Sequence, residues 1–359
     1  MMGVFSGHGE EGSRCANFSQ RVLPQQLAKF VRQKRVQAYK KSLKSAGKTN
    51  QGAWNPKMWP LLSALEYKQC CERAFRETNK MLHEDKNIDD RFSGTSLASV
   101  CFHGKHMYVC NVGACNVILG RRCSDNSTRS YKNCSDYNGE EEKCEIEEYA
   151  CHSDKAEEIP CRSVGERLAV PLTTNHTVCS LEEQERIKLF GAEVKEVNQT
   201  EEDTSSIFDT QEGGGSGRKS LRAFLPGKAY PSSRLTRSIG DSALEEIGIV
   251  SDPDTISCNL AETDDVVVIA SNAVFEFLSN QEVIDLCTAS CDPLQASEAV
   301  TRAAYKKWIE KKNRCDDITV IVCFLSKNAT KNSARSEVVN VSTEMDVPAM
   351  ADFDEEDDV

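Results

Sequence analysis

The sequence predicts an α+β fold in which two β-sheets pack face to face and helices cover their outer faces. Short apolar runs typical of hairpin strands follow two amphipathic helical segments in the first third of the chain. Near the other end, residues 265–270 (DVVVIA) and 318–324 (ITVIVCF) are continuous apolar strands, the pattern of a sheet buried on both faces. Helical spacing at residues 281–286 and 294–311 separates these two strands. Hairpin strands, paired helices and doubly covered strands together indicate two packed sheets with helices outside.

The elements of the first half are expected in the following order. Residues 10–47 form a helix, because apolar side chains such as Leu23, Leu27 and Phe30 recur on one face. A loop at residues 50–60 precedes a second amphipathic helix. This second helix and three strands then occupy the following ranges: 61–83, 96–102, 107–112 and 116–119.

Two polar inserts and a polar tail interrupt or follow this pattern. The first insert, about residues 121–165, is rich in Ser, Asn, Asp, Glu and Cys. The second, about residues 200–222, contains EGGGSG and is expected to be mobile. Apolar residues then thin out towards an acidic end that is expected to be disordered. We therefore assign residues 1–326 to one domain and residues 327–359 to a disordered acidic tail.

The charge of the chain excludes two classes of partner. The net charge is −12 and 28% of the residues are charged, which argues against a nucleic-acid binder and against attraction to anionic membranes. No apolar run is long enough to cross a bilayer, and the N-terminus lacks the residue order of a signal peptide. The 17 cysteines are scattered and odd in number, which indicates reduced thiols in a cytoplasmic protein.

Two local clusters each leave a choice open. The cysteines of the first insert suggest zinc, but their spacing contains no Cys-X-X-Cys pair, which favours unbound thiols. These cysteines are Cys123, Cys134, Cys144, Cys151 and Cys161. The largest basic patch, Arg32–Lys48, is either a solvated helix face or a docking site for a partner.

A series of motifs follows a fixed order along the chain. It begins with GVFSGHGEEG (residues 3–12), which reads as a strand end, a glycine-rich turn and the start of a helix. It continues with SGT (93–95), NVG (111–113), LTTNH (172–176), EQERI (183–187), LTRSIGD (235–241), IASNA (269–273) and DDITVIV (316–322). Each motif alone is weak, whereas their order is specific.

This series resembles the metal-dependent type 2C protein serine/threonine phosphatases, across roughly residues 1–326. The stretches TRSIGDS (236–242), VFEFLS (274–279) and RCDDIT (314–319) are most similar to the phosphatase part of certain plant and protist proteins. Those proteins join such a domain to cyclic-nucleotide-binding and kinase-like parts. The resemblance implies an α-β-β-α sandwich, with two antiparallel sheets between outer layers of helices.

The resemblance also implies a pair of Mg²⁺ or Mn²⁺ ions, held by carboxylates and waters in a cleft between the sheets. A water that bridges the two ions attacks the phosphate directly. Two dications ~4 Å apart repel by roughly 16 kcal/mol at an effective dielectric of ~20, so fixed negative oxygens have to offset this repulsion. Neutral isosteres cannot replace these carboxylates.

The sequence departs from the family at the ligand positions. Ser6 stands where the resemblance implies an aspartate that bridges both metals. Asn272 stands where it implies a metal-binding aspartate, and Ala114 where it implies an aspartate associated with a further metal. Asn175 replaces a fourth aspartate, to which we assign a structural role. Three metal-ligand positions thus lose negative charge from one cleft.

Other site residues are retained. The resemblance implies that Gly7 offers a backbone oxygen to a metal and that His8 donates a proton to the leaving group. It also implies that Asp316 binds a metal, with Glu276 as a nearby carboxylate. Without a metal-activated water, His8 is more simply a vestigial turn residue hydrogen-bonded to backbone, and Asp316 either braces the following strand or binds one ion weakly. Asp241 is retained in a structural role.

The family's first two strands precede the glycine-rich turn and supply a metal-ligating acid and a phosphate-binding arginine. This sequence begins only a few residues before its turn. Either the sequence is truncated or the fold has lost edge strands, and the second case predicts an exposed sheet edge.

These departures favour a catalytically impaired pseudophosphatase that acts by protein binding, as a scaffold, a competitor for phosphoproteins or a fixed part of an assembly. No cofactor is expected, and any Mg²⁺ or Mn²⁺ is expected to bind weakly. The alternative is a residual metal-dependent phosphatase that hydrolyses phosphoserine or phosphothreonine with Asp316, Glu276, waters and His8. A third hypothesis is a fragment of a signalling protein that regulates a cyclic-nucleotide-dependent neighbour.

Overall fold

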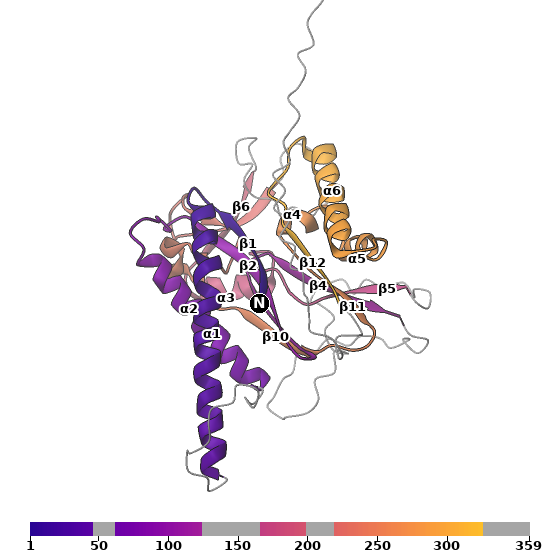
Figure 1. Ribbon diagram of the computed structural model, residues 1–359. Coiled ribbons are helices and arrows are strands. Elements are labelled where there is room, and N and C mark those ends of the chain that lie inside the picture. Colours follow the sequence, from indigo (N-terminus) through magenta and orange to yellow (C-terminus); the bar gives the residue numbers. More distant parts are fainter. Residues whose placement is uncertain (46–61, 124–165, 199–218, 326–359) are drawn as a thin grey trace, which may run out of the picture.

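The computed structural model describes residues 1–45, 62–123, 166–198 and 219–325. In Figure 1, two sheets lie at the centre, with one pair of long helices on one side and a second pair on the other. Buried apolar clusters fill the space between the sheets and the space between each sheet and its helices. The predicted α+β architecture, with helix, sheet, sheet and helix layers, is therefore confirmed.

The first sheet carries the glycine-rich turn at one edge. Its strands are, in spatial order, β1 (Met2–His8), β2 (Gly94–His103), β3 (His106–Val112) and β10 (Asp254–Asn259), with β9 (Ile239–Gly240) paired to the start of β2. Neighbouring strands are antiparallel. Successive residues face opposite sides, so Val4 packs between the sheets and Phe5 packs under the helices. Within the described residues, β1 forms an edge of this sheet.

The second sheet is also antiparallel. Its strands are, in spatial order, β12 (Val320–Phe324), β11 (Asp264–Ala270), β4 (Asn116–Arg122) and β5 (Arg167–Pro171). Strand β4 extends two residues into the first predicted insert. The reason is that Arg121 pairs with Asp264 at 2.7 Å, and Arg122 pairs with Asp265 at 3.0 Å.

Each outer face is covered by two helices. These are α1 (Gly12–Ser45) and α2 (Ala64–His83) on the first sheet, and α5 (Asn280–Thr288) and α6 (Pro293–Lys312) on the second. Helix α2 begins later than predicted because Ser63 caps it: the Ser63 hydroxyl accepts the N–H of Glu66 at 3.2 Å, and Glu66 accepts the N–H of Ser63 at 3.1 Å. Asp292 caps α6 in a similar way.

The strands of a smaller unit beside the sandwich were not predicted. This unit contains α3 (Leu181–Leu189), β6 (Glu193–Asn198), β7 (Lys219–Phe224), β8 (Ser232–Ser233) and the 3-10 helix η3 (Ser242–Ile247). The last residues of the second predicted loop, from Lys219, therefore belong to a strand. The rest of that loop, the first insert from residue 124 and the predicted tail (327–359) lie outside the described residues, so the domain boundaries stay a prediction.

The composition raised two expectations, one about membrane-spanning helices and one about the cysteines. In the described ranges, no helix has both the length and the apolar character needed to cross a membrane. The thirteen described cysteines are all free thiols. Of the five insert cysteines, only Cys123 lies among the described residues, so the zinc alternative falls outside them.

Candidate functional site

The predicted site residues of the second sheet lie where three of its strands begin or end. Ala270, the last residue of β11, pairs with the first residue of β4 and with the first residue of β12. This register brings together the segments that precede β4, follow β11 and precede β12. Ala114, Asn272 and Asp316 lie in these three segments, in that order.

The end of β1 joins this cluster from the first sheet. Ser6 pairs with Ser96 across β1 and β2, and a Cβ atom on Gly113, next to Ala114, would lie 2.3 Å from the Ser96 hydroxyl oxygen. Strand β1 also contacts β11 and β12 across the sandwich. Ser6, Ala114 and Asn272, the three neutral residues at predicted ligand positions, therefore come from strand ends that meet at one end of the sandwich.

Two glycines allow the turn after β1 to pack against its surroundings. A Cβ atom on Gly7 would lie 2.2 Å from the carbonyl oxygen of Gly12, so the strand end packs directly on the first residue of α1. Gly9 has a φ of +82°, and a Cβ atom there would lie 2.3 Å from the carbonyl oxygen of Phe92. Only glycine fits both requirements at Gly9. These contacts fix the position of the intervening His8.

His8 forms an ion pair with a carboxylate from a distant motif. Its Nε2 lies 2.7 Å from Oδ2 of Asp241, and the Ser238 hydroxyl donates to the same oxygen at 2.6 Å. The N–H of Asp241 donates to the carbonyl oxygen of Ser93 at 2.9 Å. The His8 side chain is 30% exposed, whereas that of Asp241 is 3% exposed. The buried carboxylate of Asp241 thus holds a His8 side chain that stays partly exposed.

This pairing favours the charged form of His8. Burial lowers the pKa of His8, but the charge of Asp241 and its hydrogen bond raise the pKa by more, so the pKa lies above its ordinary value. Burial likewise raises the pKa of Asp241, but the charge of His8 and the hydrogen bonds from His8 and Ser238 hold it below its ordinary value. The sequence predicted backbone hydrogen bonding for His8; the structure gives it a side-chain partner instead.

Ser271 connects the end of β11 to the loop that carries Asp316. Its hydroxyl accepts the N–H of Thr319 and donates to the carbonyl oxygen of Asp317, both at 3.1 Å. Its own N–H donates to the carbonyl oxygen of Thr319 at 3.0 Å. Asp316 accepts the N–H of Asp317 at 2.9 Å. Asn272 and Asp316 are therefore held in adjacent segments by a residue that the sequence analysis did not single out, although it lies inside the IASNA motif.

The two predicted carboxylates near this point differ in position. Burial of its carboxyl group is the main reason that the pKa of Asp316 lies above its ordinary value, and the charge of Asp317 adds to it, although the residue as a whole is exposed. Glu276 lies one turn beyond Asn272, and its N–H donates to the Asn272 carbonyl oxygen at 3.1 Å. It ends the short helix α4 (Asn272–Phe275), which is anchored by the Trp308 indole N–H on the carbonyl oxygen of Ala273 at 2.8 Å.

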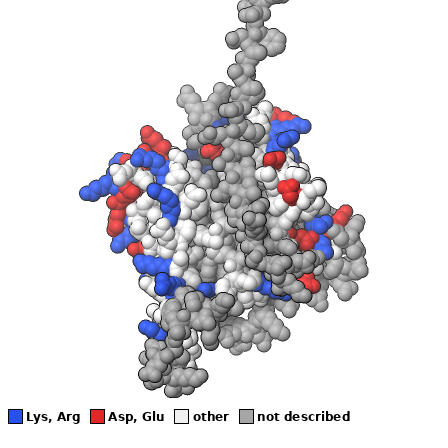
Figure 2. Space-filling view, viewed as in Figure 1, with Lys and Arg blue, Asp and Glu red and all other residues white. Residues whose placement is uncertain are grey.

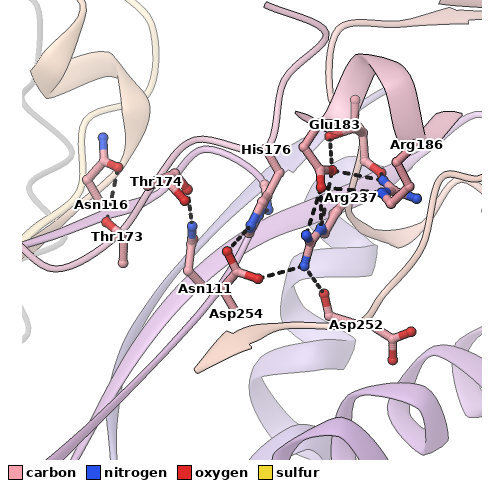
Figure 3. Close-up of polar contacts among 12 residues, drawn as sticks. Asn111, Asn116, Thr173, Thr174, His176, Glu183, Arg186, Arg237, Asp252 and Asp254 are labelled. Atoms are coloured by element: carbon pink, nitrogen blue, oxygen red, sulfur yellow. Dashed lines mark hydrogen bonds and ion pairs between the residues drawn. The ribbon is translucent and has the colours of Figure 1, made fainter. Parts of the chain in front are cut away.

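The turn before Ala114 rests on a polar network, drawn in Figure 3. The N–H of His176 donates to the Gly113 carbonyl oxygen at 2.9 Å, and Nδ1 of His176 accepts the Gly113 N–H at 3.1 Å. Nε2 of His176 then donates to Asp254 at 2.9 Å. Arg237 bridges Asp254 and Glu183 at 2.8 and 2.7 Å. Motifs LTTNH, EQERI and LTRSIGD are thereby joined beneath the site.

Both acids of this network remain ionised at neutral pH. Burial raises the pKa of Asp254, but the hydrogen bond from His176 and the charge and hydrogen bond of Arg237 lower it to about 2. Burial also raises the pKa of Glu183, and hydrogen bonds from Arg237 and Arg186 lower it well below its ordinary value. The charges of Asp254 and Glu183 are paired with Arg237 inside the network, so these two residues have a structural role.

The donor set at the site fits a pair of hard dications poorly. Such ions require several anionic oxygens, and here three of the predicted ligand positions carry Ser6, Ala114 and Asn272. Asp316 and Glu276 are the two carboxylates at the predicted positions. Across the described ranges, no group of three or more His, Cys, Asp and Glu side chains is placed to hold a metal ion.

Comparison with known proteins agrees with the motif order. A sequence profile of the family "Protein phosphatase 2C" matches residues 2–142 and 159–312. "Probable protein phosphatase 2C 35" of Arabidopsis thaliana is 28% identical over 330 residues, which cover 90% of this chain and 73% of that protein. "Probable protein phosphatase 2C 12" of Oryza sativa subsp. japonica is 26% identical over 271 residues, or 75% of this chain and 55% of that protein. The chain thus spans little more than half of the rice relative.

A solved structure shows the same fold. The chain is similar to the serine-threonine phosphatase 2C from Toxoplasma gondii, with a TM-score of 0.57, 12% sequence identity, and coverage of 90% of this chain and 83% of that chain. The finer likeness to proteins with cyclic-nucleotide-binding and kinase-like parts stays a prediction. From the matched profile, the relatives and the shared fold, the chain belongs to the protein phosphatase 2C family.

Proposed function

We propose that this chain is a pseudophosphatase, which keeps the phosphatase 2C fold and acts by binding a protein partner. One observation supports the proposal most directly. The strand ends that meet at the site present Ser6, Ala114 and Asn272, none of which can carry negative charge. A dinuclear centre has to offset a repulsion of roughly 16 kcal/mol between dications, and Asp316 with Glu276 supplies too little negative oxygen for that.

The residues that remain suit binding better than hydrolysis. His8 pairs with Asp241, which raises the pKa of His8 and so favours its charged form, and part of its side chain is exposed. An imidazolium can donate a hydrogen bond to a phosphoryl oxygen, but hydrolysis also needs an activated water. This supports a competitor that holds phosphoproteins without cleaving them, or a fixed component of an assembly.

A comparison of phosphopeptide binding with phosphopeptide turnover tests the proposal. Wild-type protein in Mn²⁺ is expected to bind a phosphothreonine peptide and to release no phosphate above buffer. The triple variant Ser6→Asp, Ala114→Asp, Asn272→Asp is expected to gain turnover, because it restores three anionic oxygens to a preserved scaffold. The uncharged control is the double variant Ser6→Asn, Ala114→Asn, which has asparagine at all three positions because residue 272 is already Asn272. Asparagine is nearly the size of aspartate but carries no charge, so this variant is expected to stay inactive. Wild-type turnover above buffer would contradict the proposal.

The alternative function is a residual metal-dependent protein serine/threonine phosphatase. The intact His8–Asp241 pair and the adjacent segments that carry Asn272 and Asp316 favour it. Under this alternative, Asp316→Asn is expected to abolish any measurable activity, because only Asp316 and Glu276 carry carboxylates at the predicted positions and neither can be spared. Activity that survives Asp316→Asn, or no activity at all, removes the alternative.

The wider assignment is part of the same proposal. A net charge of −12 supports protein partners rather than nucleic acids or anionic membranes, and the free thiols of the described cysteines are consistent with a cytoplasmic location. A role in signalling, as part of a larger protein with a cyclic-nucleotide-dependent neighbour, belongs here too. Immunoprecipitation of the wild-type and His8→Ala proteins tests the binding role, because partner recovery through the site is expected to fall in the variant.

A further inference from the structure

Helix α1 concentrates positive charge in an otherwise acidic chain. Its residues Gly12–Ser45 include nine Lys or Arg and no Asp or Glu, although the whole chain has a net charge of −12. The nine are Arg14, Arg21, Lys29, Arg32, Lys34, Arg35, Lys40, Lys41 and Lys44. The other pair of covering helices has no such imbalance, since α5 and α6 together carry five Lys or Arg and four Asp or Glu.

Four of these cations line one exposed side of the helix, here named the α1 cationic face. They are Arg21, Lys29, Arg32 and Lys40, and all four side chains are exposed. At 3.6 residues per turn their spacing keeps them within about a quarter of the helix circumference. Their Cα atoms extend over about 28 Å at 1.5 Å per residue. The core residues of α1, such as Leu23 and Leu27, point elsewhere into the first sheet.

The cationic face has no acidic partner within the described residues. Arg21 donates to the carbonyl oxygen of Asn17 at 3.3 Å, and Lys29 donates to the side-chain oxygen of Gln26 at 3.5 Å. Neither contact neutralises charge. Figure 2 shows Lys and Arg side chains along the side where α1 lies, and Figure 1 shows the C-terminal turns of α1 projecting past the beginning of α2. A row of exposed like charges of this kind attracts a multivalent anion.

The sequence contains a segment of matching charge. Residues 336–359 include nine Asp or Glu and no Lys or Arg. The nine are Glu337, Glu344, Asp346, Asp352, Asp354, Glu355, Glu356, Asp357 and Asp358, of which the last six lie within seven residues. The acidic stretches of residues 124–165 are interrupted by Lys and Arg, so residues 352–358 match the cationic face better.

The acidic segment can reach the helix. Strand β12 ends at Phe324 and contacts β1, the strand that leads into α1. The chain between Phe324 and Asp352 spans up to about 90 Å when extended, at 3.3–3.6 Å per residue. Sheets and their covering helices are each spaced about 10 Å apart, so this length is ample. Because the segment is tethered to the helix by the same chain, its effective concentration at the helix is about millimolar.

We propose that the α1 cationic face binds the acidic segment 352–358 of the same chain. Exposed ion pairs are individually weak, so the contact depends on several charges acting together and on the tether. This contact shields the α1 cationic face from other anions. It does not depend on whether the site hydrolyses phosphate.

A fluorescent peptide with the sequence of residues 350–359 tests the proposal. The host is the full chain with its tail neutralised by Asp352→Asn, Asp354→Asn, Glu355→Gln, Glu356→Gln, Asp357→Asn and Asp358→Asn. The peptide is expected to bind this host at least tenfold more tightly than it binds wild type, because the wild-type face is already occupied. Binding is expected to weaken at least tenfold between about 50 and about 500 mM NaCl, since salt screens exposed charges.

Two further variants locate the contact. Adding Arg21→Gln, Arg32→Gln and Lys40→Gln to the neutralised host is expected to remove peptide binding. Adding Arg302→Gln, Lys306→Gln and Lys311→Gln on α6, a matched loss of three exposed cations, is expected to leave it unchanged. Equal peptide affinity for wild type and neutralised host, or an equal effect of the two triple substitutions, overturns the proposal.

Lysine acetylation distinguishes an intramolecular contact from other occupants. Lys29 and Lys40 are expected to react at least threefold more slowly in wild type than in the neutralised host, at every protein concentration. Protection that disappears on dilution would place the tail on a second copy and overturn the proposal. Binding of phosphatidylserine vesicles or of a single-stranded oligonucleotide to the neutralised host, without peptide binding, would assign the face to that anion instead.

Discussion

His8 and Asp241 are 233 residues apart in sequence and 2.7 Å apart in the fold. Asp241 is buried, adopts a φ of +53° and accepts hydrogen bonds from both His8 and Ser238. A positive φ is uncommon for residues other than glycine, and aspartate is one of the few types that adopt it with some frequency. The charge state of His8 therefore depends on one carboxylate.

Replacing that carboxylate is expected to change the titration of His8. In Asp241→Asn the pKa of His8 is expected to fall, because burial still lowers it while the charge that raises it is gone. The Cε1 proton of His8, followed by NMR against pH, measures this shift. Asp254→Asn, which removes a carboxylate from His176 instead, is the control and is expected to leave His8 unchanged. A His8 pKa that stays raised in Asp241→Asn would show that another group holds its charge.

A second residue-scale prediction concerns the turn itself. Gly9→Ala is expected to destabilise the protein by about 2–5 kcal/mol, since it adds the cost of a positive φ to an overlap with the Phe92 carbonyl. Gly104→Ala is the matched control, with a φ of +63° and no atom within 4 Å of the added Cβ. It is expected to cost about 1–2 kcal/mol. Urea unfolding of both variants measures the difference, and equal losses would contradict the contact with Phe92.

At the scale of elements, a histidine joins three segments that surround the site. His83, near the end of α2, lies between Asp90 in the following loop and Glu245 in η3, with Nε2 at 3.0 Å from Glu245 and Nδ1 hydrogen-bonded to Asp90. Burial lowers the pKa of His83, but hydrogen bonds and charges from Asp90 and Glu245 raise it to about 9. Asp90 in turn accepts the hydroxyl of Ser242 at 3.0 Å, next to Asp241.

This cluster predicts a loss of stability at alkaline pH. The folded pKa of about 9 lies above the unfolded value of about 6.5. The contribution of His83 is therefore complete below pH ~6.5 and disappears as the pH rises towards ~9, by about 1–3 kcal/mol. Urea unfolding of wild type between pH 6 and 10 is expected to show this decrease, and His83→Gln is expected to flatten it. Equal slopes for the two proteins would remove His83 as the cause.

The elements also show which sequence signals were reliable. The continuous apolar strands β11 and β12 were predicted, because strands covered on both faces differ clearly from loops. Strands β5, β6 and β10 were missed, because each is short and mixed in polarity: β10 (DTISCN) pairs only with β3 in the described residues, and β6 (EVKEVN) belongs to the small outer sheet. Pattern alone could not separate them from polar connections.

For the whole molecule, motif order predicted the family and the layered fold, whereas contacts between distant motifs were not predictable. No local pattern shows that Asp241 pairs with His8. Nor does one show that Ser271 hydrogen-bonds to the segment after Asp316, or that His176 hydrogen-bonds to the turn before Ala114. These contacts depend on the register of two sheets. The loss of negative charge at Ser6, Ala114 and Asn272 could be read from the sequence, and the structure adds that their strand ends meet.

The most direct test of this account is the stoichiometry of Mn²⁺ binding by isothermal titration calorimetry, on the chain as it is and on Ser6→Asp, Ala114→Asp, Asn272→Asp. The wild-type chain is expected to give no saturable binding at micromolar Mn²⁺, and the triple variant is expected to bind the metal, because fixed carboxylates offset the repulsion between dications. Two Mn²⁺ ions bound to the wild-type chain at micromolar affinity would contradict the account.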